Sequence, residues 1–177
     1  MARIVIVSHR HDRLARLLME NTYSAVVTSN FEIDFQAGDL LCWLPTVNEP
    51  VDDEVQDLAA AIDRAVFAPQ KIVMLSIAGT ADDANLNQVK HWYDKHAQQA
   101  VWAHQYAVKM IDELELPYVV VRSLPIVEGK SPLQIVDEGQ KMTGEQIGDQ
   151  TLAAVLQTAL TTSRYDNHSI GVMPKTK

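Results

Sequence analysis

The sequence contains a single cysteine, Cys42, and this scarcity excludes both a disulfide framework and a cysteine-rich zinc site. Basic residues are also few: 15 lysines and arginines stand against 23 aspartates and glutamates, which gives a formal charge of −8. A chain this acidic does not attract nucleic acid through its overall field. Nucleic acid is therefore not expected among its partners.

Long apolar runs are absent as well. No stretch approaches the roughly 18 residues that a membrane span needs, and the run Ile4 to Val7 is too short for the core of a signal peptide. We therefore expect a cytoplasmic protein with no membrane partner. The 177 residues and their 47% apolar content fit one domain over residues 1–177, with a loose tail at 174–177.

Strand-like and helix-like segments alternate along the chain. Short apolar, β-branched runs are typical of buried strands, whereas apolar residues spaced by three and four predict amphipathic helices. Strands are expected at 4–7, 24–28, 39–44, 71–76, 118–122 and 168–173, with short additional strands at 33–35 and 134–136. Helices are expected at 12–21, 50–67, 86–114 and 148–160.

This alternation predicts an α/β fold with a doubly wound, mostly parallel sheet and helices on both faces, in three α/β/α layers. In such sheets ligands bind at the carboxyl ends of the strands, near the point where the strand order reverses. Candidate site residues therefore belong to the turns that follow Val7, Thr28, Leu44, Ser76 and Arg122.

Four segments carry a recognisable pattern in a fixed order. They are Ile72–Gly79 (IVMLSIAG), Leu116–Ser123 (LPYVVVRS), Gln146–Ala153 (QIGDQTLA) and His168–Val172 (HSIGV). Together they resemble the atypical branch of the short-chain dehydrogenase/reductases, which holds NAD(P)H-binding, NmrA-like and NADH:flavin-reductase-like proteins. The resemblance implies a Rossmann-like fold with a site for NADP or NAD.

The resemblance also implies a glycine-rich turn after the first strand, where bare backbone lets a diphosphate approach. Here the turn from Ser8 to Arg13 contains no glycine, and the first glycine of the chain is Gly38. A side chain at each position would crowd the space that the diphosphate occupies in the family. The segment between residues 22 and 45 is also short for the strand–helix–strand unit that completes the adenine side.

Arginines surround this turn: Arg3, Arg10, Arg13 and Arg16 stand against Asp12 alone. Three interpretations stay open. The arginines form a solvated helix face, or they bind an anion in place of backbone N–H groups with help from a helix N-terminus, or a residual dinucleotide site persists.

The candidate ligand contacts lie in the turns at the carboxyl ends of the strands. After the second strand, Thr28 and Ser29 bring neither an acid for a ribose diol nor an arginine for a 2′-phosphate, so nothing there chooses NAD over NADP. The resemblance places Arg122 beside a substrate, and a buried salt bridge is an equally good interpretation. The complete candidate binding set is Ser8, His9, Arg10, His11, Arg13, Thr28, Ser29, Leu44, Pro45, Ser76, Ile77, Ala78 and Arg122.

Active members of the wider family use a serine, a tyrosine and a lysine four residues after that tyrosine, which lowers the tyrosine pKa. Ser76 matches the serine position, but no Tyr-x-x-x-Lys follows it. Tyr106 and Lys109 are three residues apart and are the nearest substitute. A strand-end serine and a surface pair are the alternative interpretations of these residues. The missing motif argues against carbonyl reduction rather than against the fold.

Metal binding is not expected. His9 and His11 have only Asp12 as a third ligand nearby in the sequence. His96 and His104 lie two turns apart on the expected helix 86–114, too far for one metal, and are interpreted as packing or bonding locally.

These observations predict a small protein with an eroded dinucleotide site, acting as a ligand-sensing or interaction module in the manner of regulatory NmrA-like proteins. The alternative is an NAD(P)H-dependent oxidoreductase that reduces a flavin or quinone, because hydride transfer between two stacked rings needs no tyrosine–lysine pair. The expected partners are a small molecule or dinucleotide and a second copy of the chain. Trp102 and Tyr106, on a second face of the helix 86–114, predict that this helix forms a homodimer.

Overall fold

The computed structural model describes residues 2–10 and 12–176. Its centre is a seven-stranded sheet in the order β2-β1-β3-β4-β5-β9-β7, parallel throughout except that β7 runs antiparallel to β9. In that order the strands are Ala25–Thr28, Ile4–Val7, Leu40–Trp43, Lys71–Ile77, Tyr118–Ser123, His168–Pro174 and Leu133–Val136. The prediction of a doubly wound, mostly parallel α/β sheet is confirmed.

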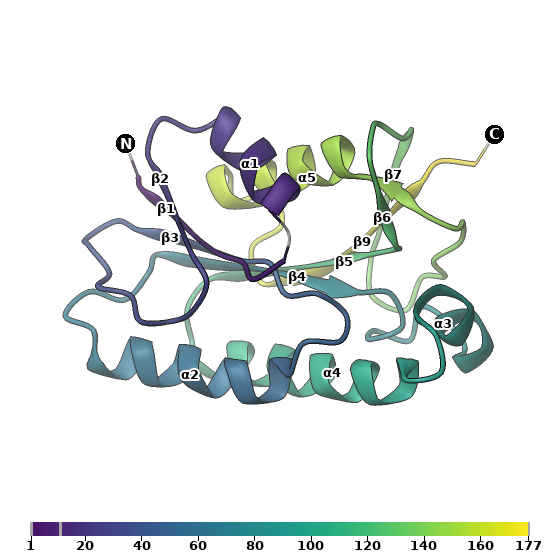
Figure 1. Cartoon of the computed structure of the whole chain (residues 1–177), viewed down its shortest axis with the longest axis horizontal. Coiled ribbons are helices and arrows are strands. Elements are labelled where there is room, and N and C mark those ends of the chain that lie inside the picture. Colours follow the sequence, from purple (N-terminus) through teal and green to yellow (C-terminus); the bar gives the residue numbers. More distant parts are fainter. Residues whose placement is uncertain (1, 11, 177) are drawn as a thin grey trace.

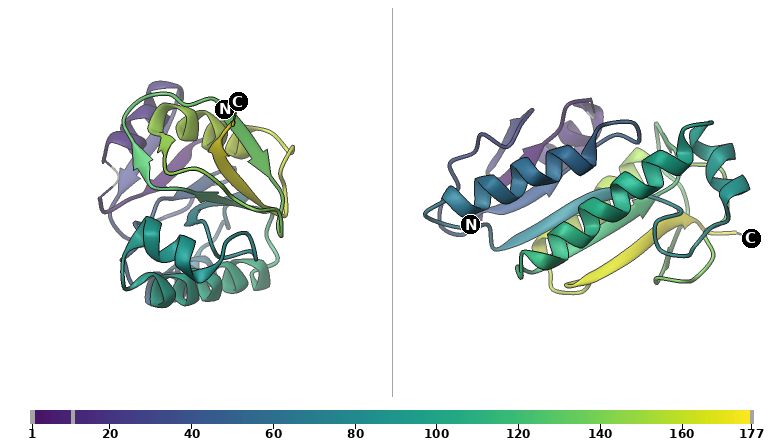
Figure 2. Two further views of the ribbon diagram at one scale, coloured as in Figure 1. Left: turned by 90° about the vertical axis from the view of Figure 1, so that its right-hand side faces the viewer. Right: turned by 90° about the horizontal axis from the view of Figure 1, so that it is seen from below.

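Helices cover both faces of this sheet, as Figure 1 shows. Helices α1 (Asp12–Glu20) and α5 (Asp149–Thr161) pack on one face, and α2 (Val51–Arg64) and α4 (Ala97–Glu113) pack on the other. The remaining helix, α3 (Leu86–Tyr93), lies at one end of α4, as the view from below in Figure 2 shows.

The alternation of side chains along each strand produces two apolar cores. In β1, Ile4 and Ile6 contribute to the core under α1 and α5, whereas Val5 and Val7 contribute to the core under α2 and α4. A strand buried on both faces has no polar side to present, and this explains why β1 and the centre of β4, residues 72–75, are continuous apolar runs in the sequence.

A second, two-stranded sheet joins β6 (Ile126–Val127) to β8 (Ile147–Gly148) and was not predicted. Gly148 makes this close approach possible, because a Cβ at that position would lie 2.3 Å from the carbonyl oxygen of Gly129. The small sheet brings the start of α5 beside the segment that follows β5.

The predicted single helix at 86–114 is wrong, because two helices occupy this segment. The break falls at Asp94, whose φ of 79° lies in the left-handed region. The Asp94 carboxylate accepts the backbone N–H of His96 at 2.8 Å and so satisfies a donor that a continuing helix would have used.

Other boundaries differ from the prediction. Residues 33–35 form no strand; the loop there buries Phe31 and Phe35 against the α2 side of the sheet. Helix α2 ends at Arg64 rather than Phe67, because Ala65 turns into extended backbone, and Val66 is exposed. At the carboxyl end, Pro174 belongs to β9 and the Lys175 N–H donates to Pro132, so only residue 176 of the described tail lacks such an anchor.

No helix within residues 2–10 and 12–176 has the length and apolar character needed to cross a bilayer.

Candidate functional site

The strand order reverses at β1, which pairs with β2 on one side and β3 on the other. At this carboxyl edge lies a cavity of about 340 Å³. Its walls come from the start of α1, the loop after β3, the ends of β4 and β5, the end of α3, the segment 123–128 and the start of α5. The cavity thus lies where a doubly wound sheet is expected to bind a ligand.

A buried serine–histidine pair forms part of the inner wall. Ser76, near the end of β4, has its Oγ 3.0 Å from Nδ1 of His104 on α4, and both side chains are buried. Nε2 of His104 lies against the backbone carbonyls of Thr46 and Val47 without a hydrogen bond of good geometry. Burial lowers the pKa of His104 to about 4, although these carbonyls act in the opposite direction. The imidazole is therefore neutral at pH 7.

Two further hydroxyl groups line the same wall. The Tyr93 hydroxyl, at the end of α3, donates to the backbone carbonyl of Ser123 at 2.5 Å, and the Ser123 hydroxyl donates to the carbonyl of Leu124 at 2.9 Å. Burial raises the pKa of Tyr93 well above its usual value. Tyr93 is thus a neutral phenol that donates its proton to the Ser123 carbonyl rather than to the cavity.

The mouth of the cavity carries a paired arginine. Nε of Arg13 bonds the Asp149 carboxylate, and Nη1 lies 3.2 Å from the Glu128 carboxylate. Asp149 is the first residue of α5 and also accepts the Gly129 N–H at 3.0 Å. Burial acts to raise the pKa of Asp149, but the Gly129 N–H and Arg13 outweigh it and hold that pKa below its usual range.

Acidic residues also lie next to the first turn. Nε2 of His9 is 3.7 Å from the Glu54 carboxylate. Burial raises the pKa of Glu54, and the negative charge of Glu49 adds to this effect. The crevice between β1 and β3 therefore has carboxylates beside it, which oppose a phosphate group.

No protein-family model matches this sequence, and no curated protein matches it. Solved structures do match. A short-chain dehydrogenase/reductase from Veillonella parvula shares 13% identity, with 98% of this chain and 95% of that chain covered, at a TM-score of 0.77. A second structure of a V. parvula short-chain dehydrogenase/reductase, in complex with NADP, covers 97% and 94% at 13% identity and a TM-score of 0.70. A Rossmann-fold NAD(P)-binding family protein from Shigella flexneri covers 100% and 98% at 10% identity and a TM-score of 0.67.

The chain has the Rossmann-like fold of the short-chain dehydrogenase/reductases. At 10–13% identity, these similarities establish the fold and leave the site to be judged from its own residues.

The first turn of this Rossmann-like fold does not fit a diphosphate. It has no glycine between Ser8 and Arg13, so no bare Cα lets a phosphate approach the amides. Arg13, which could have held the anion by its side chain, is already held by Asp149 and Glu128. A phosphate placed there would meet the carboxylates of Asp149 and Glu128 as well as the guanidinium groups of Arg10 and Arg13.

The candidate binding residues separate into three groups. Members of the set that line the cavity are Arg10, Arg13, Pro45, Ser76 and Ile77. Described members that do not line it are Ser8, His9, Thr28, Ser29, Leu44, Ala78 and Arg122. Leu44 and Ala78 are fully buried in the cores. His11 lies outside the described residues.

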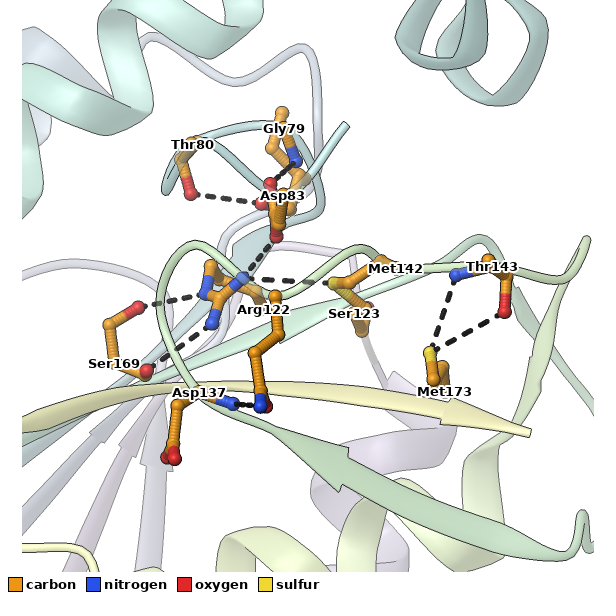
Figure 3. A network of polar contacts seen from close by, with 12 residues as sticks. Gly79, Thr80, Asp83, Arg122, Ser123, Asp137, Met142, Thr143, Ser169 and Met173 are labelled. Carbon is orange, nitrogen blue, oxygen red and sulfur yellow. Dashed lines mark hydrogen bonds and ion pairs between the residues drawn. The ribbon is translucent and has the colours of Figure 1, made fainter. Parts of the chain in front are cut away.

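Arg122 forms the buried salt bridge rather than a substrate contact. Figure 3 shows its guanidinium directed at Asp83, with Ser169 on its other side. Nε donates to the Ser169 hydroxyl at 2.9 Å, and Asp83 in turn accepts the Gly79 N–H at 2.7 Å. Both charged side chains have no exposed surface. The network ties β5 to β9 and to the loop after β4.

Tyr106 and Lys109 do not reach the cavity. Tyr106 is 41% exposed and lies with Trp102 in a shallow hollow between α4 and the start of α2. Lys109 lies on another exposed part of α4, beside Asp112. The structure therefore places them as surface residues, away from Ser76.

Sequence reasoning missed several lining residues, namely Tyr93, Ser123, Glu128 and Asp149, as well as His104 behind Ser76. Asp149 lies in a segment that carried the family resemblance, so its position could have been weighed as a site residue. Within residues 2–10 and 12–176 there is no group of three or more side chains arranged to hold a metal.

Proposed function

We propose that this protein is a small-molecule-binding module of the short-chain dehydrogenase/reductase fold whose dinucleotide site has eroded. The observation that carries the proposal is the clamp on Arg13. Asp149 and Glu128 form ion pairs with the Arg13 guanidinium at the place where the fold otherwise holds a diphosphate. The binding cavity beyond the clamp persists, so a ligand without a diphosphate is favoured.

The cavity supports ligand binding by its size and composition. A volume of about 340 Å³ lies at the lower end of the range for small-molecule pockets, about 300–1,000 Å³. Its lining combines apolar groups from Leu14, Val47 and Leu75 with the polar groups of Ser76 and Tyr93. Such a mixture binds a ligand through apolar contact and orients it through a few hydrogen bonds.

Titration with NADPH and NADH, followed by the fluorescence of the reduced nicotinamide, tests the erosion. We expect no saturable binding up to millimolar cofactor. If binding does occur, Arg10→Ala and Arg13→Ala separate its sources: side-chain anion binding is lost in these variants, whereas backbone binding survives. Saturable micromolar binding by the wild type would refute the proposal.

The second candidate function is an NAD(P)H-dependent oxidoreductase that reduces a flavin or quinone without a tyrosine–lysine pair. Two observations favour it: Ser76 lines the cavity at the serine position of the family, and one similar structure contains NADP. Micromolar NADPH binding together with turnover of free flavin would establish this alternative.

We further propose a homodimer formed through α4. Its support is the exposure of two aromatic side chains on that helix, Trp102 at 62% and Tyr106 at 41%. Sedimentation velocity tests the assembly, and a monomer at high concentration would refute it. The cytoplasmic location stays a prediction.

A further inference from the structure

Three hydroxyl groups on the β4–β5 side of the cavity share one property. Ser76, Tyr93 and Ser123 all line the cavity, and all three hydroxyls are engaged with buried protein groups. Tyr93 and Ser123 donate their protons to backbone carbonyls. The direction of the third bond depends on which nitrogen of His104 carries the proton.

The surroundings of His104 decide that direction. Nε2 is buried next to the backbone carbonyls of Thr46 and Val47, and it has no hydrogen bond of good geometry to any described residue. A bare Nε2 would place its lone pair against carbonyl oxygens, whereas a protonated Nε2 directs an N–H toward them. The proton therefore belongs on Nε2, so Nδ1 is the acceptor and the Ser76 hydroxyl donates to it.

Each of the three oxygens is left with lone pairs and no proton to offer. The Thr46 hydroxyl, on the β3 side of the cavity, has no partner among the described residues and can still donate, so the property of accepting only belongs to Ser76, Tyr93 and Ser123. We name these three residues the acceptor wall. A ligand carbonyl, carboxylate or phosphate against the acceptor wall would meet oxygen lone pairs alone, and an unpaired buried acceptor is costly.

We propose that the cavity binds a small neutral molecule that donates hydrogen bonds through hydroxyl or N–H groups, and that His104 sets this preference by fixing the Ser76 hydroxyl. This inference rests on the proposed ligand-binding function and names the chemical class of its ligand. The formal charges at the mouth cancel, because Arg10 and Arg13 are matched by Glu128 and Asp149, so a neutral ligand is also favoured by charge.

The protonation of His104 can be measured on the wild-type protein. Long-range ¹H–¹⁵N correlation NMR at pH 7 distinguishes the protonated ring nitrogen from the bare one. We expect the proton on Nε2. A proton on Nδ1 would overturn the inference, because the ring would then donate to Ser76 and the serine proton would be available to the ligand.

Matched probes test the selectivity itself. Binding of cyclohexanol and cyclohexanone, and of benzamide and N,N-dimethylbenzamide, is followed by ¹H–¹⁵N chemical-shift titration of the wild type. The donor member of each pair should bind about fivefold more tightly or better, the gain expected from one additional hydrogen bond. Equal binding within each pair would refute the acceptor wall and leave ligand binding intact. A cavity that binds no probe would refute the proposed function, and the tautomer measurement would still decide the polarity of the wall.

Variants connect the selectivity to the pair. Ser76→Ala should reduce the preference for the alcohol over the ketone, whereas the exposed Ser163→Ala should leave it unchanged. His104→Leu removes the acceptor and releases the Ser76 proton, so the preference should move toward cyclohexanone. A merely structural role of His104 would weaken both probes alike, and that result would refute its positioning role. Should His104→Leu not fold, the tautomer measurement and the binding preference of Ser76→Ala still test the proposal.

Discussion

Replacing Asp149 with asparagine perturbs the Arg13 clamp with little change in shape. Asp149→Asn removes one negative charge but keeps an oxygen that can accept the Gly129 N–H. Among the described residues, Arg13 then retains the exposed Glu128 as its ion-pair partner. The variant therefore isolates the charged contact between α1 and α5.

The expected cost follows from the exposure of the two partners. The Asp149 side chain is 5% exposed and the Arg13 side chain is 45% exposed. A hydrogen bond to a charged group contributes about 1.5–3 kcal/mol, whereas an ion pair at the surface contributes about 0–1 kcal/mol. A half-exposed guanidinium places this pair near the lower limit, so we expect a loss of about 1 kcal/mol in the free energy of unfolding at pH 7.

Urea unfolding at several pH values measures this loss. The pKa of Asp149 is lowered in the folded state relative to its usual 3.8, so its contribution is present above about pH 3.8 and is lost as the pH falls through the folded-state pKa. The difference between wild type and Asp149→Asn should therefore shrink below pH 3.8. Glu128→Gln is the matched control and should change stability by less than about 0.5 kcal/mol. A difference that is equally large at pH 7 and pH 2.5 would refute the ionic account of the clamp.

Three further predictions concern residues away from the clamp. Asp83→Asn or Arg122→Met breaks a fully buried ion pair and should lower the free energy of unfolding by about 3–5 kcal/mol. Lys109→Met, at an exposed position, should change the free energy of unfolding little. A small effect of Asp83→Asn or Arg122→Met in urea unfolding would contradict the network. His104 stays neutral in the folded protein, whereas its imidazole takes up a proton in the unfolded chain between pH 6.5 and about 4. The free energy of unfolding of the wild type should therefore fall as the pH drops through this range. His104→Leu should lack this part of the pH profile, and an unchanged profile would be evidence against the buried neutral ring. Trp102→Asp should convert the proposed dimer to monomer in sedimentation velocity, and an unaffected dimer would place the interface elsewhere.

The strands could be predicted because burial on both faces leaves a local signature. The run 72–75 is apolar and starts with two β-branched residues, and the observed strand is Lys71–Ile77. The break at Asp94 left no such signature. Tyr93 and Ala97 are both buried and are four residues apart, so the apolar spacing continues across the break. The decisive event is a contact of the Asp94 side chain with the backbone, which periodicity does not record.

The site could be predicted only as far as topology determines it. Ser76, Arg10 and Arg13 were expected at the carboxyl edge because parallel strands bring their ends together there. What each side chain does at that edge depends on partners far away in the sequence. Arg13 and Asp149 are 136 residues apart, and no local pattern indicates that a carboxylate from α5 pairs with the Arg13 guanidinium.

The fluorescence titration of the wild-type protein with NADPH, repeated with NADH, tests the central claim most directly. The account predicts no saturable signal up to millimolar cofactor, because the turn from Ser8 to Arg13 has no glycine and Arg13, one of its two arginines, is held by carboxylates. Saturable binding in the micromolar range would contradict the account, and its survival in Arg10→Ala and Arg13→Ala would show that the backbone provides a working site.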